Sequence, residues 1–147
     1  MLKLNGADFT FGRTRFFESP PGGGEPTPKI FVKILAPGFE EPLFAQLDTG
    51  AAWSVLACEV AEMLGLLDGS GEPRDLRTRD GVKTGYLVRV PLIIPADEGQ
   101  GESLNIEATF FVCPDWPQGR TFIGYSGFIE FIRIALDPQQ YYFYFGA

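Results

Sequence analysis

The sequence predicts a mostly β fold, and three observations lead to this class. The chain of 147 residues holds 14 Phe and 5 Tyr, and aromatic side chains suit the faces of a pleated sheet. It also holds 18 Gly and 12 Pro, which implies many turns. Its apolar stretches are short and are separated by turn-forming residues. A chain of this size is expected to form a single domain that covers residues 1–147.

Near the N-terminus, we expect a short strand pair followed by a long loop. Residues 9–12 and 14–17 would form the two strands. Residues 19–28 contain four Pro and three consecutive Gly, which excludes a helix or a central strand. This segment is therefore expected to be a flexible loop with no chemistry of its own.

The next segments predict two strands that lead to an acidic turn. Residues 29–35 and 43–47 are apolar and β-rich, and the second of them ends directly before Asp48. Residues 57–67 place apolar side chains at helical spacing and predict a short amphipathic helix. The Asp80-Gly81 dipeptide, flanked by strand formers, predicts a β-hairpin.

The C-terminal half predicts further strands and a second helix. Residues 86–94 and 104–112 are β-rich, and residues 125–132 are expected to form a second short helix. The segments 134–136 and 141–145 predict a hairpin. The aromatic run 141–145 could stack on nucleic-acid bases, but it has no basic neighbours in the sequence, so we expect an edge strand packed in a dimer interface.

Composition excludes several classes of function. The chain has no His, which rules out Ser-His-Asp and Cys-His catalysis within one chain, as well as His-ligated metals. Acid–base chemistry near neutral pH must then come from carboxylates, Lys, Tyr or Cys. Cys58 and Cys113 have no CxxC partner and are expected to be reduced core residues.

Charge and hydropathy bear on partners and location. The net charge is −7 and no concentrated basic stretch occurs, which argues against nucleic-acid binding. No apolar run approaches the ~20 residues of a membrane-spanning helix, and the N-terminus does not have the pattern of a signal peptide. We therefore expect a cytoplasmic protein with neither a nucleic-acid nor a membrane partner.

The strongest candidate for chemistry is Asp48-Thr49-Gly50. A plain turn would also explain these residues. However, the carboxylate lies between an apolar strand and Val55-Leu56, so we expect poor solvation, which disfavours a lone ionised carboxylate. A second carboxylate sharing a proton would solve this problem, and the chain has no second such triplet. A two-fold homodimer would bring Asp48 beside its symmetry mate.

Two segments together resemble the retropepsin-like aspartic proteases. Residues 48–56, DTGAAWSVL, resemble the active-site pattern of that family: Asp-Thr-Gly-Ala, two variable residues, Ser or Thr, Val, and Ile or Leu. Phe122-Ile123-Gly124 resembles its second element, two apolar residues and Gly before the C-terminal helix. The resemblance implies a closed acid-protease β-barrel with two short helices and one lobe per chain.

The resemblance also implies a function and residue roles. Asp48 would be the catalytic residue of an aspartic endopeptidase, in which Asp48 and its partner's copy activate a water without metal or cofactor. In the active-site loop with Ala51, Thr49 would hydrogen-bond across the dimer axis and Gly50 would admit close backbone approach. The implied partners are a second copy of the chain and a peptide or protein substrate.

A flap and a substrate pocket complete the implied site. The flap would comprise Arg79, Asp80, Gly81, Val82, Lys83, Thr84 and Gly85, and the pocket would include Phe122, Ile123 and Gly124. Two positions differ from retroviral members, which usually carry Arg at Tyr125 and often a polar or acidic residue at Trp53. An alternative therefore remains open, a catalytically inactive dimeric peptide-binding or scaffold protein on the same fold.

Overall fold

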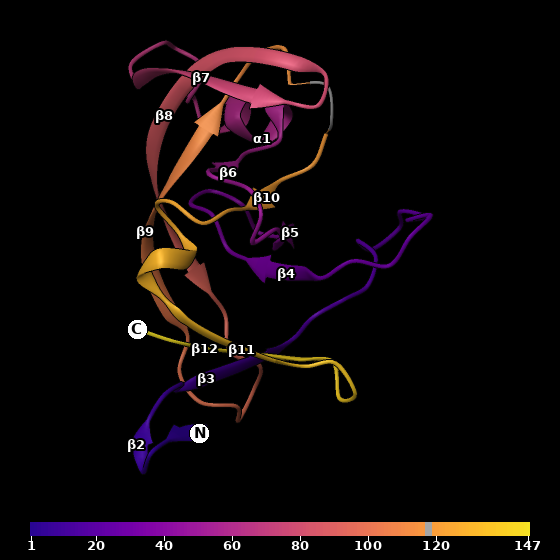
Figure 1. Cartoon of the computed structure of the whole chain (residues 1–147), viewed down its shortest axis with the longest axis vertical. Helices are drawn as coiled ribbons and strands as arrows, with labels where there is room; N and C mark the ends of the chain where they lie inside the picture. Colours follow the sequence, from indigo (N-terminus) through magenta and orange to yellow (C-terminus); the bar gives the residue numbers. More distant parts are fainter. Residues whose placement is uncertain (117–118) are drawn as a thin grey trace.

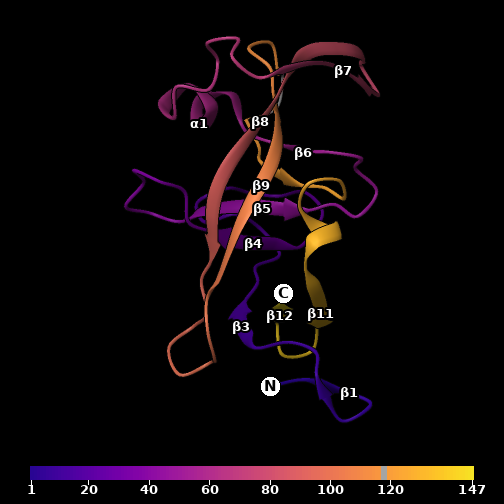
Figure 2. The same cartoon turned by 90° about the vertical axis from the view of Figure 1, so that its left-hand side faces the viewer.

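The computed structural model describes residues 1–116 and 119–147, and most of its regular structure is strand (Figures 1 and 2). The strands are β1 (Lys3–Leu4), β2 (Ala7–Asp8), β3 (Gly12–Arg15), β4 (Phe31–Ile34), β5 (Leu43–Leu47), β6 (Ser54–Val55), β7 (Glu72–Thr78), β8 (Gly81–Ile94), β9 (Leu104–Val112), β10 (Phe122–Ile123), β11 (Arg133–Asp137) and β12 (Tyr142–Gly146). The helical elements are α1 (Cys58–Met63) and the 3-10 turn η1 (Ile129–Phe131). The described part of the chain contains no helix with the length and hydropathy needed to cross a lipid bilayer.

The largest sheet has seven strands in the order β4-β5-β10-β6-β9-β8-β7. Its longest strands are the antiparallel pair β8 and β9, which run along the left of Figure 1. The sheet ends in β4 and β7, so the predicted closed barrel is wrong. β4 runs antiparallel to β5 and reaches β8 at a single bridge, between Leu35 and Ile93, so the ladder between these two strands does not form.

The core lies on both faces of β9. In its first half, buried Leu104 and Ala108 alternate with exposed Asn105 and Glu107, as expected for a strand with one solvated face. Its last residues lie between β6 and β8 and are buried on both faces. Each fully buried Phe side chain in this core contributes about 1.5–3 kcal/mol relative to exposure.

The helix predicted at residues 57–67 is present but shorter. α1 ends because Gly65 adopts φ +70, and the Leu66 N–H donates to the Ala61 carbonyl at 2.9 Å, which closes the helix with a C-terminal cap. This glycine conformation turns the chain away before Leu67.

The second predicted helix, at residues 125–132, is wrong. Only η1 forms there, and it is a single 3-10 turn. Gly127 has φ +75 and packs so closely on Thr109 that a Cβ would lie 2.6 Å from the Thr109 Cβ. Gly127 therefore interrupts the segment, and the Ile and Phe residues that follow lose side-chain freedom in a helix.

The predicted N-terminal strand pair at 9–12 and 14–17 is also wrong. The N-terminal hairpin is instead β1-β2, whose turn residues Asn5 and Gly6 have φ 51 and 81. An Asn-Gly turn with positive φ at both residues is a strong hairpin signal, and it was present in the sequence.

A three-stranded sheet in the order β11-β12-β3 joins the two ends of the chain. It lies at the bottom of Figure 1. The hairpin predicted around Asp137-Pro138 is confirmed as β11-β12. However, β12 is the central strand of this sheet, so the expectation of an edge strand at 141–145 is wrong. Phe143 and Phe145 point into the core, where burial between β11 and β3 is more favourable than at an edge.

The Pro/Gly-rich segment 19–28 forms no helix or strand, as predicted, but a buried carboxylate anchors it. The Glu25 side chain is 4% exposed and pairs with Lys29 at 2.9 Å and with Arg120. These partners hold the pKa of Glu25 below its ordinary value, with the Lys29 hydrogen bond as the largest cause. The loop is thus fastened next to the segment that leads into β10.

Candidate active site

The candidate site forms where β5, β6 and β10 meet. β10 lies between the other two strands, parallel to β5 and antiparallel to β6. Ile123 pairs with Leu47, and the Asp48 N–H donates to the Ile123 carbonyl at 2.9 Å. The two sequence segments that resemble retropepsins are therefore adjacent in the fold, and together they place Asp48 at the end of β5.

The Asp48-Thr49-Gly50 loop is held by hydrogen bonds from its own backbone. The Gly50 N–H donates to Asp48 Oδ1 at 3.0 Å, and the Ala51 N–H donates to the Asp48 carbonyl at 3.2 Å. The Asp48 side chain is half-buried, and Thr49 and Gly50 are exposed. In the single chain, Asp48 is thus partly covered, whereas the loop that follows it stands at the surface.

A buried contact beneath the loop fixes the crossing of β6 and β10. The Gly124 N–H donates to the Ser54 hydroxyl at 2.9 Å, and Ser54 is fully buried. A Cβ at Gly124 would lie 2.5 Å from the Trp53 carbonyl group, so only glycine fits there. The sequence pattern contains Ser54, but its bond to Gly124 spans 70 residues and could not be read from the sequence.

Next to Asp48 the chain forms a cleft of about 370 Å³. Asp48 is the only carboxylate among the described residues that line it. The other residues lining the cleft are mostly small or apolar: Gly50, Ala51, Ala52, Trp53, Val55, Leu76, Arg77, Thr78, Trp116 and Phe122. Among the described residues, no group of three or more His, Cys, Asp or Glu could hold a metal ion.

Trp53 and Trp116 belong both to the cleft and to a small core. They pack, with Leu76 and Phe122, against the buried cluster of Val55, Leu87, Phe111 and Cys113. Trp116 meets Phe111 edge to face at a centroid distance of 6.3 Å. The walls of the cleft are therefore fixed by packing. From the sequence, the two Trp residues could line a cleft or fill a core, and they do both; Leu76 is a site residue that the sequence did not single out.

The predicted hairpin over the cleft is confirmed as β7-β8, with its turn one residue earlier than expected. Thr78 pairs with Gly81, so the turn residues are Arg79 and Asp80. The Thr78 hydroxyl accepts from the Asp80 N–H at 3.2 Å and donates to the Gly81 carbonyl at 2.8 Å. The side chain of Thr78 thus selects this turn over one centred on Asp80-Gly81.

The hairpin residues that line the cleft differ from the predicted flap. They are Leu76, Arg77 and Thr78 of β7, whereas residues 79–85 form the turn and the start of β8. Gly85 is buried, and a Cβ there would lie 2.2 Å from the Val112 carbonyl oxygen. It therefore serves close packing rather than mobility.

The hairpin also contacts the active-site loop. The Arg74 guanidinium lies over the Trp53 ring, 5.4 Å from its centroid. Stacking of this kind contributes about 0.5–1 kcal/mol at exposed sites. It connects β7 to the residue that follows the Asp-Thr-Gly-Ala-Ala loop and narrows the cleft between them.

Two large aromatic side chains are exposed in the segment that follows β10, and the first of them is hydrogen-bonded to the Asp48 loop. Tyr125, whose N–H donates to the Ala51 carbonyl at 2.9 Å, is 54% exposed, and Phe131 in η1 is 60% exposed. Figure 2 shows η1 beside the loop that follows β5. Large exposed aromatic side chains next to a functional loop are typical of a contact surface.

Comparison with solved structures finds a similar fold in an aspartic protease. The crystal structure of a retropepsin-like aspartic protease from Rickettsia conorii matches with a TM-score of 0.56 and 16% sequence identity, over 92% of this chain and 98% of that chain. No protein-family model and no curated protein matches the sequence. The chain thus has a mostly β fold similar to that of a retropepsin-like aspartic protease, and at this identity the likeness concerns the fold.

Proposed function

We propose that the protein is an aspartic endopeptidase that acts as a homodimer. The observation that carries the proposal is the position of Asp48. It directly follows β5, its N–H is hydrogen-bonded to Ile123 of β10, and it lines a mostly apolar cleft. A carboxylate held beside a cleft that can take apolar side chains suits peptide hydrolysis. The similar fold of an aspartic protease supports the same reading.

The mechanism requires Asp48 from each of two subunits. Two carboxyls that share one proton titrate as a coupled pair, in which one stays ionised and the other protonated. The ionised carboxylate takes a proton from a water, the water oxygen attacks the scissile carbonyl carbon, and the protonated carboxyl gives its proton to the carbonyl oxygen. The carboxyl that took the water's proton then gives it to the amide nitrogen as the C–N bond breaks, and the carbonyl re-forms as the carboxylic acid product, which returns a proton to the pair. Thr49 would bond across the two-fold axis.

The exposed pair of Tyr125 and Phe131 supports a dimer at this place. Tyr125 is hydrogen-bonded to the loop that must meet its symmetry mate, and Phe131 follows it in η1. Burying these two exposed side chains in an interface would remove apolar surface from water. An extended peptide substrate would lie in the cleft beside β7. Its side chains would contact Trp53, Trp116 and Phe122, which line the cleft.

A second candidate is a dimeric peptide-binding protein without catalysis. The contact between Arg74 and Trp53 favours it, because the stacked pair ties β7 to the active-site loop and would resist opening for turnover. The same cleft would then hold an extended peptide without cutting it.

Cleavage of a mixed peptide library, read by mass spectrometry across acidic to neutral pH, separates the two candidates. The wild type should cut the library. Asp48→Asn should abolish cleavage while it remains folded and dimeric by sedimentation. Glu102→Gln is the matched control, because it removes one exposed carboxylate away from the cleft, and it should cut as the wild type does. A folded wild-type dimer that cuts nothing would contradict the peptidase.

A further inference from the structure

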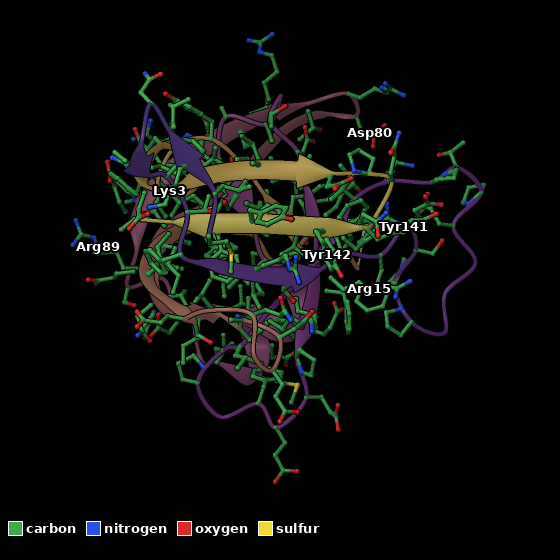
Figure 3. The ribbon with its side chains drawn as sticks, turned by 90° about the horizontal axis from the view of Figure 1, so that it is seen from below. Lys3, Arg15, Asp80, Arg89, Tyr141 and Tyr142 are labelled. Carbon is green, nitrogen blue, oxygen red and sulfur yellow. The ribbon has the colours of Figure 1, made fainter. Side chains whose placement is uncertain are left out.

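The outer face of the β11-β12-β3 sheet carries an unusual set of side chains. Phe143 and Phe145 of β12 are buried, so the alternating Tyr142 and Tyr144 point to the other face. The register places Arg15 beside Tyr142 and Arg13 beside Tyr144. We call Arg13, Arg15, Tyr141, Tyr142 and Tyr144 the arginine–tyrosine face. Figure 3 views this sheet from below, with Arg15, Tyr141 and Tyr142 near one end.

Stacking organises the guanidinium groups on this face. Arg13 Cζ lies 3.8 Å from the Tyr142 ring centroid and 5.7 Å from that of Tyr144. Arg15 Cζ lies 5.6 Å from the Tyr141 centroid. Stacking uses the flat surface of a guanidinium and leaves its in-plane N–H groups to acceptors in that plane. Arg13 already donates in this way, from Nη2 to Gln100 Oε1. Arg15 is exposed and therefore presents such donors to solvent.

The backbone at Tyr141 is strained. Its φ is 59, in the left-handed region that a bulky aromatic residue rarely adopts. The conformation places the Tyr141 ring 5.7 Å from that of Phe16 and within reach of Arg15. Strain of this kind is concentrated at functional positions, where the surrounding fold maintains it.

No carboxylate among the described residues pairs with a guanidinium group of this face. The Asp97 carboxylate lies at the edge of β3, where it accepts the Arg15 backbone N–H at 2.8 Å and pairs with Lys33. Neither Arg13 nor Arg15 forms a salt bridge in the described part of the chain, although acidic residues outnumber basic ones and the net charge is −7. Across the sheet, Asp137 pairs with Tyr142, but its carboxylate accepts the N–H groups of Gln139 and Gln140. The face is thus a basic patch on an acidic protein.

We propose that the arginine–tyrosine face binds an extended acidic segment of a partner protein. Arg and Tyr are enriched among the residues that dominate binding energy at interfaces. A guanidinium binds a carboxylate through two parallel hydrogen bonds, and the tyrosine rings supply flat apolar area beside it. The partner's carboxylates would supply the charge that the chain itself does not place there.

Single-stranded nucleic acid is the competing ligand. The sequence offered no basic neighbours for the aromatic run 141–145, but the fold brings Arg13 and Arg15 beside it from β3. A polypeptide is favoured because binding to a phosphate backbone needs a broad basic surface, whereas this patch holds two arginines on a molecule of net charge −7.

Fluorescence anisotropy with a short labelled polyglutamate peptide tests the proposal. At low salt the wild type should bind it, and Arg15→Gln should weaken binding about tenfold, as for loss of a charged contact residue. The affinity of Arg15→Lys should lie between those of the wild type and Arg15→Gln, because Lys keeps the charge but lacks the planar guanidinium that forms two parallel hydrogen bonds. The matched control is Arg89→Gln, an exposed arginine of β8 on the opposite side of Figure 3, which should bind within about twofold of the wild type.

Several outcomes would overturn the proposal. They are no binding at low salt, equal weakening by Arg89→Gln and Arg15→Gln, or tighter binding of oligothymidine than of polyglutamate. Thermal denaturation confirms that each variant is folded. Arg15→Gln should cut the peptide library as the wild type does, so a failure of the peptidase proposal would leave this one standing, and the reverse also holds.

Discussion

At the scale of single residues, Gly124 and Ser54 decide where Asp48 lies. The Ser54 hydroxyl accepts the Gly124 N–H inside the protein, and this bond joins β6 to the end of β10. A buried hydrogen bond contributes about 0.5–1.5 kcal/mol, and an unsatisfied partner costs about 1–3 kcal/mol. The Asp48-Thr49-Gly50 loop is therefore positioned by a buried bond outside the residues that line the cleft.

Gly124→Ala should destabilise the protein by at least about 2 kcal/mol, because the new methyl group would overlap the Trp53 backbone and cannot move aside. Urea denaturation measures this change. Gly24→Ala is the matched control, since a Cβ at Gly24 has nothing within 4 Å, and it should be neutral or slightly stabilising. Equal stability of the two variants would show that the β6-β10 crossing is looser than described.

At the scale of elements, Asp97 fastens three segments together. Its carboxylate accepts from the Thr14 hydroxyl at 2.9 Å, the Arg15 N–H at 2.8 Å and Lys33 Nζ at 2.8 Å. These contacts join β3 and β4 to the turn that follows β8. Burial raises the pKa of Asp97, but the bonds from Lys33, the Arg15 N–H and Thr14 outweigh it, and the net pKa lies below its ordinary value of 3.8.

A carboxyl with a lowered folded-state pKa stabilises the fold above its ordinary pKa and loses that contribution as the pH falls through the folded value. Asp97→Asn should therefore reduce stability by about 1 kcal/mol near neutral pH, and its difference from the wild type should shrink below about pH 4. Urea titrations over this pH range test it. Glu98→Gln, at an exposed neighbouring residue, should change the free energy of unfolding little. If Asp97→Asn lowered the free energy of unfolding equally at every pH, the ionised carboxylate would not be the cause.

Most strands could be predicted, but their partners could not. Apolar and β-branched runs indicated β4, β5, β8 and β9 because those residues favour a half-buried pleated surface. The central place of β12 depends on pairing with β3, more than a hundred residues away in sequence. The turn of β7-β8 depends on a side-chain bond from Thr78, which outweighed the Asp80-Gly81 signal.

At the scale of the whole molecule, the proposed peptidase needs a second copy of the chain to complete its site. Asp48 stands partly exposed at the mouth of its cleft, without a second carboxylate among the described residues lining it. Tyr125, which is hydrogen-bonded to Ala51, and Phe131 are both exposed. Both features have one explanation if a second copy covers this side of the chain.

Phe131→Asp should weaken self-association at least about tenfold, because it places a charge in the proposed apolar contact. Sedimentation velocity over a range of concentrations measures the effect, and peptide cleavage should fall in parallel. Met63→Asp is the matched control, since Met63 is 74% exposed on α1, and it should associate as the wild type does. Unchanged dimerisation of Phe131→Asp would place the interface elsewhere.

The sequence by itself determined the β-rich class, the strand that ends at Asp48, and the resemblance of residues 48–56 and 122–124 to an aspartic-protease site. Those features are local, because they depend on residue preferences and on short motifs. The tertiary structure decided the open sheet, the walls of the cleft formed by Leu76 and Trp116, and the arrival of Arg13 and Arg15 beside the tyrosines of β12. These features depend on contacts between distant segments, and the packing energy that selects such contacts is a property of the folded chain as a whole.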